Sequence, residues 1–124
     1  MLNDIRIEGA PNFKLSEFQS PDTGEVKIDS VLAAKLQQLR DKVGKPVIVT
    51  SGYRTPEHNR RIGGATNSFH MQGLAADIVV KGMTSREIAT VARDVGLTGI
   101  GVYPTRGHCH VDVRPGSQVF FNGE

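Results

Sequence analysis

The stretch LAADIVVKGMTSREIATVARDVG, residues 74–96, contains two different patterns in succession. Residues 74–80 are apolar apart from Asp77, which is typical of a short buried strand. The motif TSRE, which begins at Thr84, has the spacing of a capping box, and apolar residues after it recur on one helical face. The stretch therefore predicts a strand, a turn and an amphipathic helix.

Further elements are predicted on both sides of this stretch. Before it, apolar residues recur at helical spacing after Asp29 and Ser30, either of which can cap a helix start, and before Gly44, which can end a helix. After it, residues 108–113 alternate polar with apolar side chains, as a strand does. The other expected elements are an irregular arm with a short helical turn before residue 29, strands over 46–50 and 100–103, a short helix over 56–62 and an edge strand over 118–121.

The order and spacing of these elements predict the fold class. Strands separated by helices of uneven length, with hairpin-like spacing near the end, indicate an α+β fold. We expect a small, largely antiparallel sheet with flanking helices. The length of 124 residues allows one hydrophobic core but not two, so we expect a single domain over residues 1–124.

Composition and charge exclude several classes of protein. With 38% hydrophobic and 23% charged residues, the chain is typical of a globular protein. The formal net charge of +2 is too small to predict nucleic-acid binding. No run approaches the roughly 18 apolar residues of a membrane span, and the first residues do not have the pattern of a signal peptide. We therefore expect cytoplasmic synthesis, no membrane insertion and, if the protein is exported, another export route.

Two segments place polar side chains where a globular core would avoid them. A carboxylate at Asp77, inside an apolar run, has to be paired or bound to a metal, because an isolated buried carboxylate would be neutralised. In the second segment, GHCHVDVR at 107–114, strand alternation puts His108, His110, Asp112 and Arg114 on one face. The same alternation puts Cys109, Val111 and Val113 on the other face, where we expect Cys109 to be a buried structural thiol.

Two histidines and a carboxylate from separate segments can form a tetrahedral zinc site with one position left for water. Three protein ligands are the number typical of a catalytic site, where zinc lowers the pKa of a bound water to about 7 and polarises a carbonyl. The residues alone leave an alternative open. His70 could be a capped loop histidine, Asp77 could accept backbone amides at a turn, and His108 and His110 could lie on the solvated face of an edge strand.

The residues around these positions resemble a known enzyme family. The pattern S-x-H-x-x-G-x-A-x-D begins at Ser68, and a later H-x-D begins at His110. With SGYRT at 51–55, these motifs resemble the zinc D-alanyl-D-alanine carboxypeptidases and murein endopeptidases of peptidase family M15. The resemblance covers roughly residues 47–115, more than half of the chain.

The resemblance implies a metal site and a substrate-facing arginine. It implies that His70, Asp77 and His110 bind Zn²⁺, within the fold shared by hedgehog proteins and D-Ala-D-Ala peptidases. It also implies that Arg54 lies near the substrate and faces a carboxylate, for which a guanidinium offers two parallel hydrogen bonds. The alternative for Arg54 is an ordinary surface arginine.

The chain departs from the family pattern at one position. Several relatives carry an acidic residue three positions before the last zinc ligand, whereas this chain has Gly107 there. We therefore expect His108, on the same strand face as His110, to bond the tetrahedral intermediate or to shuttle a proton. Asp112 is expected to orient a zinc-bound histidine or Arg114.

The resulting functional hypothesis is a zinc peptidase that hydrolyses an amide bond in peptidoglycan stem peptides or cross-bridges. We expect a monomer that acts at the cell wall, with a phage or prophage lysin as the natural setting. The alternative is a non-catalytic murein-binding or phage structural module that retains the zinc site. A signalling domain like the hedgehog proteins fits poorly, because the chain is short. The sequence does not fix which bond is cleaved.

Overall fold

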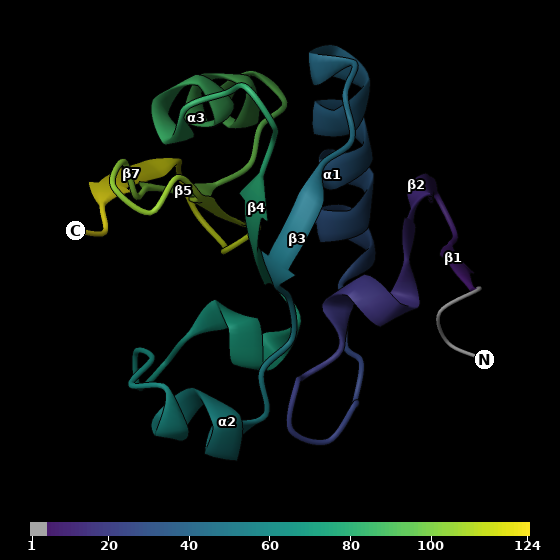
Figure 1. The fold of residues 1–124 in the computed structure, drawn as a ribbon, viewed down its shortest axis with the longest axis vertical. Coiled ribbons are helices and arrows are strands. Elements are labelled where there is room, and N and C mark those ends of the chain that lie inside the picture. The colour runs from purple at the N-terminus through teal and green to yellow at the C-terminus, as the bar shows by residue number, and fades with distance from the viewer. Residues whose placement is uncertain (1–4) are drawn as a thin grey trace.

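A mixed five-stranded sheet with two helices on one face forms the centre of the fold. The computed structural model describes residues 5–124 (Figure 1). The strands are β3 (Ile48–Ser51), β4 (Ala75–Val79), β5 (Gly99–Val102), β6 (Cys109–Asp112) and β7 (Val119–Asn122), in the spatial order β3-β4-β6-β5-β7. All neighbours are antiparallel except β5 and β7, which are parallel. The expected α+β fold with a largely antiparallel sheet is confirmed.

The helices begin and end at the residues that their sequence signals indicate. In α1 (Ser30–Val43), Asp29 accepts hydrogen bonds from two backbone amides, and Gly44 ends the helix with a φ of 65°. In α3 (Ser85–Asp94), Thr84 and Glu87 form the predicted capping box. A shorter helix, α2 (Pro56–Arg61), starts with proline in its first turn.

One hydrophobic core lies between the sheet and the helices α1 and α3. Strand alternation directs every second side chain of β4, β5 and β6 into it, including Ile78, Ile100 and Cys109. The helices contribute the apolar stripes that their spacing predicts, with Leu36 from α1 and Ile88 from α3 fully buried. In Figure 1 these two helices lie next to each other in the upper half of the view. The α2 segment lies in the lower half, beyond the end of β4 that is farther from α3.

The structure differs from the expectations at the two ends of the chain. The arm before residue 29 contains the expected helical turn, η2 (Leu15–Phe18), but also an unexpected pair of strands, β1 (Arg6–Ile7) and β2 (Ala10–Lys14). The tail forms the expected edge strand β7, although it pairs in parallel with β5. Within residues 5–124 no helix has both the length and the apolar character that crossing a membrane requires.

Strand β6 occupies a position that decides between two interpretations of its histidines. It pairs with β4 on one side and with β5 on the other, so it is an inner strand. His110 and Asp112 are both buried. The interpretation of His110 as part of a solvated edge strand is therefore wrong, and its polar face needs partners inside the protein.

Candidate metal centre

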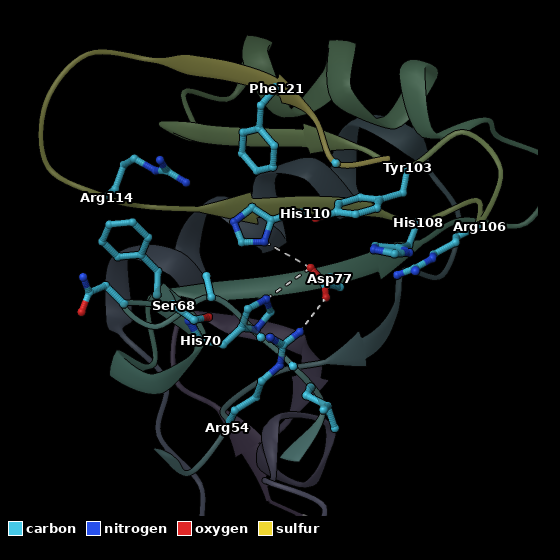
Figure 2. Close-up of a pocket in the computed structure, with 17 residues that line it drawn as sticks. Arg54, Ser68, His70, Asp77, Tyr103, Arg106, His108, His110, Arg114 and Phe121 are labelled. Carbon is cyan, nitrogen blue, oxygen red and sulfur yellow. Dashed lines mark hydrogen bonds and ion pairs between the residues drawn. The ribbon is translucent and has the colours of Figure 1, made fainter. Parts of the chain in front are cut away.

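Four neighbouring strands bring a row of paired residues to one face of the sheet. Asp77 of β4 pairs with His110 of β6, His110 pairs with Gly101 of β5, and Gly101 pairs with Phe121 of β7. Directly paired residues point to the same face of a sheet. Asp77, His110 and Phe121 therefore share the face that α1 and α3 leave free (Figure 2).

His70 reaches the same place from a loop. It lies in a short 3₁₀ helix, η3 (Phe69–Gln72), where the Ser68 hydroxyl accepts a hydrogen bond from the His70 amide at 3.2 Å. The ring Nδ1 lies 2.8 Å from the carbonyl oxygen of Gly52. A carbonyl oxygen can only accept a hydrogen bond, so Nδ1 carries the ring proton. In the neutral ring, the Nε2 lone pair then faces Oδ1 of Asp77 at 3.3 Å.

His110 is oriented in a similar way by a carboxylate. Its Nε2 lies 2.7 Å from Oδ2 of Asp112 and donates to it. Asp112 is fully buried, and Nη2 of Arg114 lies 2.6 Å from the same Oδ2. The neutral His110 ring therefore turns its Nδ1 lone pair toward Oδ1 of Asp77, at 3.2 Å. Asp112 contacts both of the groups that the sequence offered as its partners.

Two nitrogen lone pairs and a carboxylate oxygen converge in this way. The three atoms lie within 4.8 Å of one another, and they repel each other unless a cation lies among them. A proton on each ring would relieve the repulsion, and a single metal ion would relieve all of it at once. For zinc bonds of about 2.0–2.1 Å, neighbouring ligand atoms of a tetrahedron lie about 3.3 Å apart. The donor set fits a zinc ion, because its two nitrogen-to-Oδ1 separations are 3.3 and 3.2 Å.

Asp77 keeps its charge although it is buried. Burial alone would raise the pKa of Asp77, but when the His110 and His70 rings carry a second proton their hydrogen bonds and charges outweigh that effect, and the pKa lies well below its usual range. Arg54 adds an ion pair in which its Nη2 lies 3.2 Å from Oδ2 of Asp77. Oδ2 thus has a cationic partner, and Oδ1 gains one when a proton or a metal ion lies between it and the two rings.

Arg54 is fixed within the site from the loop after β3. Its Nε donates to Ser51 at 3.1 Å, and its Nη1 donates to Asn59 at 3.3 Å. Because the side chain is only 14% exposed, the alternative of an ordinary surface arginine is wrong. The carboxylate that Arg54 faces in this structure belongs to Asp77.

The convergent atoms lie at the bottom of a cleft with a volume of about 550 Å³. Three arginines line this cleft, Arg54, Arg106 and Arg114, whereas Asp77 is the one acidic side chain in its lining among residues 5–124. The other lining residues are Ile62, Gly63, Gly64, Ala65, Asn67, Ser68, Phe69, His70, Tyr103, His108, His110, Phe121 and Gly123. A cationic cleft around a buried acid attracts anionic groups.

His108 lies at the same cleft, as the strand alternation predicted. Its ring stacks on Tyr103 with the ring centroids 4.1 Å apart, and its carbonyl oxygen accepts a hydrogen bond from Ser85 at 2.6 Å. Burial lowers the pKa of His108, with Asp77 opposing the shift and Arg106 adding to it. Cys109 points to the other face, where burial raises the pKa of its thiol to about 12. The expected buried structural thiol is confirmed.

The comparison with known proteins identifies the family. The sequence model of the family described as Peptidase M15 matches residues 11–112. The chain belongs to the peptidase M15 family. It is 33% identical over 95 residues to the peptidoglycan L,D-endopeptidase MepK of Escherichia coli (strain K12), an alignment that covers 71% of this chain and 52% of the relative. It is 40% identical over 81 residues to the zinc D-Ala-D-Ala carboxypeptidase of Streptomyces albus G, covering 62% and 32%.

A further relative of this M15 chain is the probable MepK of Haemophilus influenzae (strain ATCC 51907 / DSM 11121 / KW20 / Rd), 30% identical over 97 residues. That alignment covers 72% of this chain and 52% of the relative. The chain therefore spans about half the length of the MepK relatives that it matches, and about a third of the carboxypeptidase.

Several residues of the M15 site escape prediction from the sequence. Tyr103, Arg106 and Phe121 line the cleft, but none belongs to the quoted motifs. Phe121 also lies beyond the segment that the family model matches. The one sequence signal was the pair of glycines in TGIGV, residues 98–102, because glycine inside a strand often marks a close approach by another group.

The contact between Asp112 and His110 predicts an effect on metal binding. Asp112→Asn removes the charge that fixes the His110 ring, and losing such a partner typically weakens metal affinity about 10–100-fold. Competition with a chromophoric chelator measures the zinc affinity of the variant. Asp94→Asn is the matched control, since Asp94 is an exposed acid at the end of α3. Equal affinities in the two variants would contradict the role given to Asp112.

Proposed function

We propose that this chain is a zinc-dependent peptidase that hydrolyses an amide bond in the peptide part of peptidoglycan. The observation that carries the proposal is the convergence of His70, Asp77 and His110 at the bottom of an open, cationic cleft. The family supports it, because relatives within the family are named as a peptidoglycan endopeptidase and a zinc carboxypeptidase.

In this proposal three side chains hold the zinc ion through identified atoms. They are Nε2 of His70, Oδ1 of Asp77 and Nδ1 of His110, each already turned toward the others. When bound, zinc supplies activation of a water molecule as nucleophile and polarisation of the amide carbonyl. The carbonyl of Gly52 and the carboxylate of Asp112 fix the two rings, so the ligands need little rearrangement.

The charge of the cleft supports a substrate that carries carboxylates. Stem peptides of peptidoglycan offer such groups close to their amide bonds. Arg54 uses three of its five N–H donors on Ser51, Asn59 and Asp77, which leaves one donor on each terminal nitrogen. We propose that these remaining donors and Arg106 bind a substrate carboxylate or the oxyanion that develops during attack.

Proton transfer is assigned to His108 in this proposal. Among residues 5–124 the cleft lining offers no acidic side chain besides Asp77, which faces the two histidines and Arg54. His108 is the one lining imidazole outside the donor set, and its stacking on Tyr103 restrains the ring at the cleft. A histidine in that place can accept a proton from the attacking water and return it to the leaving amine.

The place of action follows from the proposed substrate. A peptidase of this kind acts at the bacterial cell wall, and the setting in a phage or prophage lysin stays a prediction. Digestion of purified murein, with the fragments identified by mass, identifies the bond that is cleaved. D-Ala-D-Ala, L-Ala-D-Glu and cross-bridge amides are the candidates.

Metal removal tests the proposal as a whole. The protein is expected to bind one zinc ion per chain and to release new amine and carboxylate ends from murein. Treatment with a chelator abolishes this release, and one equivalent of zinc restores it, whereas His70→Ala and His110→Ala bind no zinc and stay inactive. Hydrolysis by metal-free protein overturns the zinc mechanism, and murein binding without any cleavage supports the non-catalytic module instead.

A second prediction separates proton transfer from metal binding. His108→Gln should lower kcat by about 10²–10⁴-fold, the usual contribution of a general acid or base, with zinc content unchanged. His58→Gln, in the α2 helix outside the cleft, is the matched control and should leave kcat unchanged. An undiminished kcat in His108→Gln would exclude His108 as the proton carrier.

A further inference from the structure

Phe121 occupies space beside the metal centre that a side chain of residue 101 would otherwise fill. Gly101 stands between His110 and Phe121 in the row of paired residues, and a Cβ on Gly101 would collide with the Phe121 ring. The ring therefore lies over the backbone of β5 and approaches His110, with their centroids 5.6 Å apart. Glycine in the inner strand β5 lets an aromatic side chain of the edge strand reach the site.

The ring forms one wall of the cleft. Figure 2 shows Phe121 on the side of His110 that faces away from Asp77, while Arg54 lies on the far side of Asp77. The guanidinium of Arg114 lies 5.8 Å from the Phe121 ring centroid and 4.7 Å from the ring of Phe69. The ring remains partly accessible, with 36% of the residue exposed, so it can contact a molecule in the cleft.

The neighbouring phenylalanine shows that this placement is specific to one side of β7. Phe120 pairs with Ile100, whose partner in β6 is the core residue Val111. It therefore lies on the opposite face and, with Arg86 and Ala89, lines a second groove beside α3, which Phe121 borders but which none of the three convergent ligand residues lines. Adjacent residues of one strand thus carry the same side chain to two different surfaces.

We propose that Phe121 determines specificity by selecting a short apolar side chain next to the scissile amide. This inference rests on the proposed peptidase function. The two Cα atoms that flank a peptide amide lie about 3.8 Å apart. If the amide lies at the three convergent ligand atoms, a side chain on either Cα therefore comes near the ring. A wall this close to His110 admits the methyl group of alanine and obstructs longer side chains.

The charge around the ring adds selection against amines. Arg54, Arg106 and Arg114 line the cleft, and Asp77 and Asp112 balance two of these charges. The surplus positive charge comes from Arg106 and, in the zinc-loaded protein, from the divalent ion, so a side chain that ends in an ammonium group would be repelled. Packing a methyl group against the ring takes no charged or hydrogen-bonding group out of water, so it carries no polar desolvation cost. The contact with alanine is therefore favoured over that with a diamino acid.

The experiment compares two peptides in two adjacent variants. Once the cleaved bond is known, a pair of synthetic stem peptides is prepared that has either alanine or leucine next to that bond. One pair varies the residue on the amino side of the bond, and a second pair varies the residue on the carboxyl side. The ratio of kcat/KM for alanine over leucine is measured in the zinc-loaded wild type, Phe121→Ala and Phe120→Ala. We expect Phe121→Ala to lower this ratio about tenfold or more. Discrimination of this size is typical of an apolar pocket that distinguishes side chains differing in length. Phe120→Ala should leave the ratio unchanged.

Two further measurements separate specificity from a merely structural role. Phe121→Trp, with a larger ring, should raise the ratio, and the zinc affinity of all three variants should equal that of the wild type. In the metal-free protein, the methyl resonance of a bound alanine peptide should shift upfield and lose that shift in Phe121→Ala. These readouts do not depend on the stability of a single variant.

The outcomes distinguish this inference from the function on which it rests. If the zinc-loaded wild type hydrolyses no peptide, the proposed function fails and the inference fails with it. If the wild type is active but the ratio is the same in Phe121→Ala, or falls equally in Phe120→Ala, the inference alone is overturned. A lowered ratio accompanied by lost zinc affinity also overturns it, because Phe121 would then act by supporting His110.

Discussion

Asp77 places an ionised carboxylate in an inner strand of the sheet, beside side chains that pack the hydrophobic core. Such a group costs several kcal/mol in lost hydration unless charged or hydrogen-bonding partners surround it. Here Arg54 binds one oxygen, and His70 and His110 face the other, whose charge they compensate only when a cation or a proton lies between them. The arrangement of the loops after β3 and before β4 follows from this requirement, because they deliver Arg54 and His70 to the same carboxylate.

A second buried carboxylate, Asp112, imposes the same requirement in β6, two residues after His110. Asp112 is fully buried, and its two oxygens accept hydrogen bonds from His110 and Arg114. The pKa of Asp112 is raised by burial and lowered more strongly by these bonds, so it stays ionised. Space for it comes from Gly99, where any Cβ would collide with the carboxylate. Gly99 and Gly101 weaken the inner strand β5, because glycine has no side chain to pack, but they leave space for the side chains of Asp112 and Phe121 on the face that carries the site.

The sequence predicts the parts of the site that depend on local patterns. Helix boundaries follow from Asp29, Gly44 and Thr84, and strand alternation alone places His108 and His110 on one face, away from Cys109. The motif that begins at Ser68 is sufficient to include His70 and Asp77 in the zinc hypothesis. These features are encoded within a few residues of one another.

The remaining features depend on pairings between distant segments. Nothing near Arg54 indicates that its partner is Asp77, 23 residues later. The parallel pairing of β7 with β5 likewise depends on residues 113–118, which carry the chain from β6 past β5 to the edge of the sheet, and it is what brings Phe121 to His110. Local propensity could place a strand at the tail but could not choose its neighbour or direction, which tertiary packing decides.

We infer that the lone pairs of His70 and His110 and the carboxylate of Asp77 converge because they bind one metal ion. A crystal structure of the zinc-loaded protein tests this, with the ion located by anomalous scattering at the zinc absorption edge. We predict one ion, bonded to Nε2 of His70, Oδ1 of Asp77 and Nδ1 of His110 at about 2.0–2.2 Å, with a further position open to the cleft. An ion bound elsewhere, or a crystal with no ion at these three atoms despite zinc saturation, would contradict the inference.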